Sequence, residues 1–149
     1  MWGAIQGGST CRNIYLIDVD AGKLALEISQ DNDVRAFAQR MIGDHTAVND
    51  QTLALVKKLN VTPEDNANSQ SLTKQAETTR KKLEALTGAA LDKAYIDNEV
   101  AFHKTVNSAL STTLIPDAQN SELKSLLQNG LKVFQAQERL AQQLASAKS

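Results

Sequence analysis

The chain has 149 residues, a formal net charge of −1 and a single cysteine, Cys11. This length fits one domain, which can build an interior core without a metal or a disulfide. The balanced charge argues against a nucleic-acid-binding surface, which would need an excess of Lys and Arg. No stretch approaches the roughly 18 consecutive apolar residues that a membrane span requires.

The composition indicates an all-α fold. Apolar residues make up 42% of the chain and aromatic residues 4%, and there are only two prolines and seven glycines. Ala, Leu, Gln, Lys and Glu, which favour helix over strand, are plentiful. We therefore predict an up-down antiparallel bundle of the four-helix type with an additional helix.

The segment 1–12 is expected to be a flexible tail, and residues 13–149 are expected to form the bundle domain. The segment holds Gly3, Gly7 and Gly8, and it lacks the cationic start and apolar stretch of a secretory signal. Cys11 falls in this tail with no histidine near it in sequence, so we do not expect a catalytic nucleophile there.

The next two segments carry apolar side chains at three- and four-residue steps, which predicts helices over about Asn13–Ser29 and about Asp33–Asn60. The cluster 31–33 (Asp-Asn-Asp) can supply capping oxygens for the second helix. His45 lies within the apolar stripe of that helix, so we expect its ring to point inward.

The middle of the chain is more polar. The segment 62–65 (Thr-Pro-Glu-Asp) is typical of a helix start, while residues 66–70 are irregular. We predict a third helix over about Ser71–Leu86, with Gly88 as its C-terminal cap.

Two further helices are predicted, over about Ala90–Ser111 and about Asn120–Lys148. Ile115-Pro116 should stop the helical pattern between them. Gly130 lies inside the last helix, where it costs about 1 kcal/mol relative to alanine. Close approach of a neighbouring helix would compensate for that cost.

The two histidines are the residues most suggestive of chemistry. His103 follows Glu99 by one helical turn on a surface near the core, and Asp18 is among the inward-facing positions of the first helix. A bundle can bring these residues together with His45. Two imidazoles with one or two carboxylates suit a divalent zinc, iron or manganese ion.

The same residues also have a purely structural interpretation. A buried histidine often hydrogen-bonds a carboxylate or a carbonyl, and Glu99 and His103 form an ordinary i,i+4 pair. A di-iron carboxylate site would need Glu-x-x-His on two helices. The residues three before the histidines are Ile42 and Val100, so that pattern is absent.

Several short segments together resemble a known family. They occur in the order Asp18–Ala25, Val34–Met41, Asp44-His45, Leu83–Gly88, Leu91–Tyr95 and His103. In order and spacing they look like the bacterial domain of unknown function 4142, over about Asn13 to Ala145. The resemblance implies a ferritin-like bundle without a settled activity, usually exported to the periplasm or the outer membrane.

The resemblance also bears on the candidate site. Members commonly have an acidic residue where Asp18 stands and histidines matching His45 and His103. They often have a further histidine near the position of Gln137, where this chain carries a poorer ligand.

Three hypotheses for function follow. The leading one is a non-enzymatic, extracytoplasmic bundle that binds an unknown protein or small molecule or protects the envelope under stress. The second is a mononuclear metal-binding protein that uses Asp18, His45, Glu99 and His103. The third is a ferritin-like storage or DNA-protecting shell, which would require a large assembly.

Overall fold

The computed structural model describes residues 2–62 and 67–148, and it gives the backbone alone for 2–11 and 68. Five long helices account for most of the described residues: α1 (Trp2–Ile28), α2 (Asn32–Lys58), α3 (Ala67–Glu84), α4 (Gly88–Ala109) and α6 (Ser121–Ala147). A π-helical turn η1 (Leu110–Leu114) and the short α5 (Ile115–Asp117) follow α4. No strand occurs in this part of the chain, which confirms the all-α prediction.

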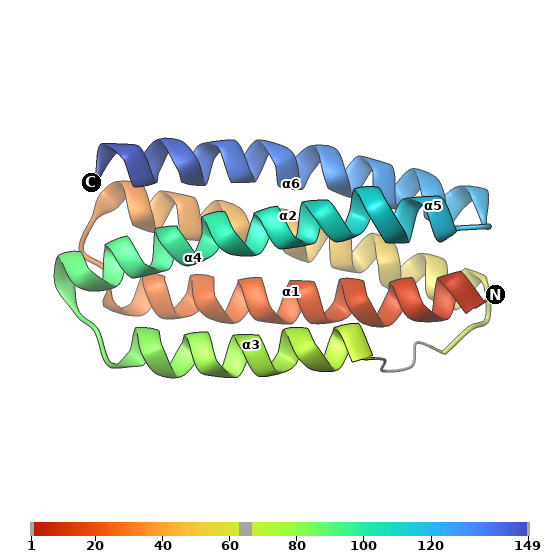
Figure 1. Cartoon of the computed structure of the whole chain (residues 1–149), viewed down its shortest axis with the longest axis horizontal. Helices are drawn as coiled ribbons and strands as arrows, with labels where there is room; N and C mark the ends of the chain where they lie inside the picture. Colours follow the sequence, from red (N-terminus) through yellow and green to blue (C-terminus); the bar gives the residue numbers. More distant parts are fainter. Residues whose placement is uncertain (1, 63–66, 149) are drawn as a thin grey trace.

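The helices form a four-helix bundle with a fifth helix on its outside (Figure 1). α1 packs on α2 and α4, and α6 packs on the same two helices from the other side. Each of the four runs antiparallel to its two neighbours, while α3 lies against α1 and α4 and runs parallel to α1. The predicted bundle is thus confirmed. None of the described helices has the length and apolar character needed to cross a membrane.

Two helix starts are capped by side chains, and the sequence predicted the first of these caps. The Asp31 carboxylate accepts hydrogen bonds from the backbone N–H groups of Asp33 and Val34, at 2.9 and 3.1 Å. Asn120 accepts one from the backbone N–H of Leu123 at 2.9 Å, at the start of α6. Gly88 differs from its predicted role: it has φ +58° and begins α4, two residues beyond the last turn of α3.

The first helix starts earlier than predicted. α1 begins at Trp2, so the expected tail is helical over residues 2–12. The segment holds no proline, and each residue added to an existing helix adds one hydrogen bond. Three glycines at about 1 kcal/mol each therefore need not stop it. The side chain of Cys11 lies outside the described part of the structure.

The helical pattern also extends further than predicted at two other places. Residues 67–70, expected to be irregular, form the first turn of α3, while 63–66 of the expected helix start lie outside the described residues. Helical structure passes through Ile115-Pro116 to Asp117, because the backbone N–H of Ile115 bonds to the Leu110 carbonyl in π register. Pro116 then stands at the start of α5, where a missing N–H costs little.

A polar layer divides the interior into two apolar clusters. The first cluster includes Ala25, Val34, Phe37, Ala38, Met41, Leu83, Leu91, Tyr95, Ile96 and Ala141. The second includes Ile14, Leu55, Val106, Leu110, Ala118, Leu123, Leu127 and Phe134. In α1, α2, α4 and α6 alike, a buried polar residue lies in sequence between members of the two clusters: Asp18, His45, Glu99, His103 and Gln137.

Among the glycines from Gly22 onward, the closest helix approach is at Gly22 and not at Gly130. A Cβ on Gly22 would lie 3.1 Å from Ile42 Cγ1 and 3.3 Å from the Ala38 carbonyl oxygen, so α1 and α2 are in near contact there. A Cβ on Gly130 would meet Phe134 alone, at an ordinary 3.8 Å. The expectation of a close approach at Gly130 is wrong.

We predict that Gly22→Val lowers the free energy of unfolding by about 1–3 kcal/mol, because the added methyl groups must push α2 away. Gly43→Val is the matched control, since nothing lies within 4 Å of its Cβ position. Urea unfolding followed by circular dichroism measures both. Equal effects of the two substitutions would contradict the close approach.

Candidate metal centre

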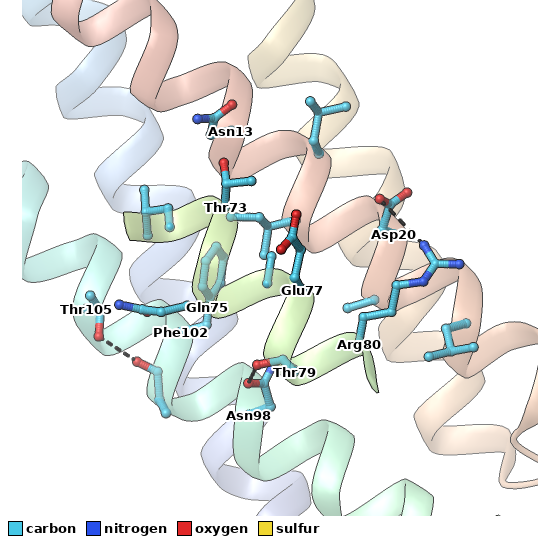
Figure 2. A pocket seen from close by; sticks show the side chains of 17 residues that line it. Asn13, Asp20, Thr73, Gln75, Glu77, Thr79, Arg80, Asn98, Phe102 and Thr105 are labelled. Carbon is cyan, nitrogen blue, oxygen red and sulfur yellow. Dashed lines mark hydrogen bonds and ion pairs between the residues drawn. The ribbon is translucent and has the colours of Figure 1, made fainter. Parts of the chain in front are cut away.

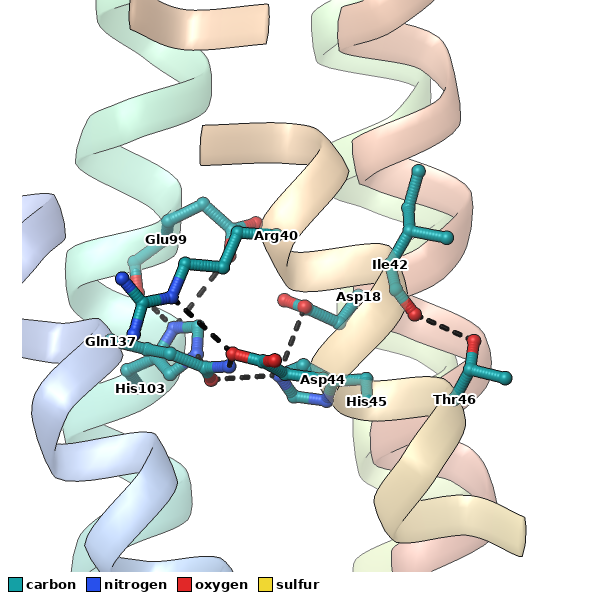
Figure 3. A network of polar contacts seen from close by, with 9 residues as sticks. All are labelled: Asp18, Arg40, Ile42, Asp44, His45, Thr46, Glu99, His103 and Gln137. Carbon is teal, nitrogen blue, oxygen red and sulfur yellow. Dashed lines mark hydrogen bonds and ion pairs between the residues drawn. The ribbon is translucent and has the colours of Figure 1, made fainter. Parts of the chain in front are cut away.

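Five side chains from four helices form the polar layer at the centre of the bundle (Figure 3). Asp18 comes from α1, His45 from α2, Glu99 and His103 from α4, and Gln137 from α6. Each is at most 1% exposed. The structure therefore brings the four residues predicted from sequence into one region and adds Gln137.

Asp18, His45 and His103 converge most closely. Each offers one ligand atom, and these atoms all lie within 4.8 Å of one another. His45 Nε2 is 3.0 Å from Asp18 Oδ2. Glu99 stays outside this group of three, although its Oε2 is 3.6 Å from His103 Nδ1.

The Gln137 amide joins the two imidazoles. Its Oε1 lies 3.1 Å from His45 Nε2 and 3.0 Å from His103 Nε2. Its Nε2 donates to Asp44 Oδ2 at 3.1 Å. Because the Asp44 carboxylate can only accept, it holds the amide with its oxygen toward the rings.

His103 is oriented so that Nε2 faces the centre. Its Nδ1 lies 2.8 Å from the Glu99 backbone carbonyl, which can only accept, so Nδ1 carries the proton. In the neutral ring this leaves a lone pair on Nε2. That lone pair then faces the Gln137 oxygen, so either a second proton or a cation is needed between them.

The spacing of the four facing atoms fits a small cation. In a tetrahedral zinc site with bonds of about 2.0–2.1 Å, neighbouring ligand atoms are about 3.3 Å apart. The three distances from the imidazole nitrogens to Asp18 Oδ2 and Gln137 Oε1 are 3.0–3.1 Å. These three distances are close to that value.

Several buried polar atoms in and around the layer have no hydrogen-bond partner among the described residues. They are Asp18 Oδ1, His45 Nδ1, Glu99 Oε2, Tyr95 OH, Asn49 Oδ1 and Asn107 Oδ1, whereas Asp18 Oδ2 has the 3.0 Å contact with His45 Nε2. Buried polar groups are normally satisfied, and an uncompensated buried carboxylate is costly. A cation beside Asp18 would offset that cost.

Burial changes the pKa values of two groups in the polar layer, Glu99 and His45. Burial raises the pKa of the Glu99 carboxyl well above its ordinary value, and the negative charge of Asp18 raises it further. A protonated Glu99 can donate to Asp18, whereas two carboxylates would repel. Burial also lowers the pKa of His45, although the Asp18 carboxylate opposes this change.

Aromatic contacts restrict the imidazole rings. Phe134 stacks on His45 with ring centres 4.7 Å apart and planes 14° apart. The two imidazoles meet edge to face, with centres 5.7 Å apart and planes at 81°. The nitrogen atoms therefore keep their directions without relying on hydrogen bonds alone.

The sequence analysis considered Gln137 only as a poorer ligand suggested by the family resemblance, and it assigned no role to Asp44. Gln137 shares the inward face of α6 with Phe134 and Ala141, and this spacing could have shown that it is buried. Asp44 lies beside the inward stripe of α2, with its side chain 38% exposed. Its contact with Gln137, 93 positions away, has no signal in the sequence.

We predict that Glu99→Gln stabilises the metal-free protein increasingly as pH rises. Because the folded pKa of Glu99 is raised, wild type loses stability as pH rises above the ordinary value of 4.5. Glutamine can donate to Asp18 without this loss. The gain in free energy of unfolding should reach about 1–3 kcal/mol near pH 8 and be smaller near pH 5.

Urea unfolding in the presence of a chelator measures this difference. Glu27→Gln, an exposed change of the same kind on α1, serves as the control and should show no such trend. A gain for Glu99→Gln that is equal at both pH values, or larger near pH 5, would contradict the assigned protonation.

Comparison with known proteins identifies the family of this chain but does not indicate an activity. The family described as Domain of unknown function (DUF4142) matches residues 10–144. No curated protein and no solved structure matches the chain. Because the match spans nearly the whole bundle and includes every residue of the polar layer, the chain belongs to the DUF4142 family.

Proposed function

We propose that this protein binds one divalent transition-metal ion inside its four-helix bundle and acts by holding the ion. The ligands are Asp18, His45 and His103, with Gln137 Oε1 as the fourth donor. The observation that supports this most strongly is the convergence of three buried ligand atoms within 4.8 Å. The buried Asp18 carboxylate provides the negative charge that a cation would neutralise.

Binding is favoured over catalysis because of burial and ligand number. Asp18, His45, His103 and Gln137 are each at most 1% exposed. Four protein donors fill the positions of a tetrahedral ion, whereas catalytic zinc sites keep one position for water or substrate. A substrate would have to displace a side chain and enter between packed helices.

The donor set narrows the class of metal. Two imidazole nitrogens with carboxylate and amide oxygens suit Zn²⁺, Fe²⁺ or Mn²⁺. The site contains no thiolate or thioether, the ligands that select Cu(I). Zn²⁺ is the ion that a four-coordinate site of this spacing fits best.

The cellular role that we propose is metal retention outside the cytoplasm, in line with envelope protection. Its support is the family resemblance, in which members are usually exported. Fractionation of a bacterium that expresses the native gene checks this: recovery of the protein in the cytoplasm alone would oppose it.

We predict that wild type retains about one Zn²⁺ per chain after equilibrium dialysis, and that Asp18→Asn weakens binding about 100-fold by removing the one anionic ligand. Asp20→Asn is the matched control, since Asp20 is exposed and two positions along the same helix. Metal content is measured on untagged protein, and circular dichroism checks that each variant is folded.

The two histidines of the chain allow a test that needs no substitution. His45 and His103 are the only histidines, so the imidazole signals in nuclear magnetic resonance report on this layer alone. Zn²⁺ should shift both sets of signals in slow exchange. Unshifted signals, or Asp18→Asn and Asp20→Asn proteins with equal metal content, would leave the layer a hydrogen-bonded network and overturn the proposal.

We predict that Asp44→Ala lowers Zn²⁺ affinity about 10-fold while leaving the stoichiometry unchanged. Asp44 holds the Gln137 amide with its oxygen toward the imidazoles, so its loss frees the fourth donor. Arg40→Ala is the control, because Arg40 contacts the same carboxylate at 3.4 Å from the solvent side. Unchanged affinity in Asp44→Ala would remove Gln137 from the ligand set.

A further inference from the structure

A second region with binding capacity lies on the other side of α1, under α3. A groove of about 420 Å³, partly open to solvent, lies between α1, α3 and α4 (Figure 2). Protein interiors are normally close-packed, and an apolar cavity of about 150 Å³ is enough to bind a benzene-sized molecule. This cavity is therefore large for a protein of 149 residues.

The sequence of α3 explains why the space exists. The residues of α3 that face the bundle at its middle are small: Thr73, Ala76 and Thr79. Leu72, which also lines the space, packs against the second apolar cluster, and Leu83 belongs to the first. The middle of α3 is thus held away from α1 and α4 without filling the gap.

The walls are mostly apolar. α1 contributes Leu16, Ile17 and Leu24, and α4 contributes Phe102. Leu16 is 44% exposed. It is one of two large apolar side chains that are exposed to solvent in the described part of the chain. An apolar molecule in this space would cover both the walls and Leu16.

The space is elongated, with a charged end and an uncharged end. A second cavity of about 240 Å³ shares Leu72, Gln75 and Thr105 with the first and has no charged residue in its lining. The charged residues of the first cavity are Asp20, Glu77 and Arg80. In Figure 2, Asp20 and Arg80 lie at one side of the pocket, and Gln75 and Thr105 lie at the other.

The charged end is better suited to a cation than to an anion. Arg80 is already paired with Glu84 at 2.8 Å and lies 3.9 Å from Asp20. Glu77 makes no ion pair within the described residues, so its carboxylate can receive one. We propose that this groove binds a single-chain amphiphile, with an ammonium head at Glu77 and Asp20 and its hydrocarbon tail running toward Leu114.

The test compares three molecules that share one chain: octylammonium, octanol and octanoate. Isothermal titration calorimetry should show one octylammonium per chain, bound about tenfold more tightly than octanoate. Glu77→Gln should weaken octylammonium binding several-fold and leave octanol binding unchanged. Octanoate binding as tightly as octylammonium, or no saturable binding at all, would overturn the proposal.

Cavity-filling variants test where the hydrocarbon tail of the ligand lies. Ala76→Leu and Thr73→Leu each place extra carbon atoms in the groove and should weaken octylammonium binding about tenfold. Ala85→Leu, an exposed position just beyond α3, is the matched control and should have no effect. If neither filling variant changes the affinity, the ligand does not occupy this groove.

Discussion

Burying two imidazoles and two carboxyl groups in one layer is the constraint on which the rest of this structure depends. Asp18 and Glu99 cannot both be ionised in a dry interior unless a positive charge lies beside them. Part of the negative charge is avoided because burial raises the pKa of Glu99, which favours its protonated form. It also aims both imidazole Nε2 atoms at oxygen atoms. A cation bound at the centre of the layer, as proposed above, would neutralise the charge of Asp18.

The layer also gives the bundle its register. The apolar side chains on the two sides of the polar layer are similar in character. Apolar packing alone would therefore allow one helix to slide by a turn at modest cost. Such a slide would place Asp18 or His45 against aliphatic side chains and leave the partner polar groups buried and alone. The polar layer therefore specifies one alignment of α1, α2, α4 and α6. The two apolar clusters provide most of the burial.

α1 separates two regions of different chemistry. Its inner face carries Asp18 toward the imidazoles, and its outer face carries Ile17 and Leu24 toward the groove under α3. α3 is the most polar helix of the bundle and buries little of its own surface, so it covers α1 and α4 without sealing them. The proposed ion site and the groove have no residue in common.

Periodicity alone determined the helices and the inward direction of both histidines, because the side-chain direction within a helix repeats every 3.6 residues whatever surrounds it. The cap at Asp31 was also predicted from the sequence, since a cap acts over three residues. The tertiary structure alone decided the contact of Gln137 with Asp44 and the near contact at Gly22. Helical structure over residues 2–12 and through Pro116 was also not predicted from the sequence. The contact of Gln137 with Asp44 and the near contact at Gly22 depend on distances between helices. The helical structure over residues 2–12 and through Pro116 depends on local hydrogen bonding that residue propensities do not fix.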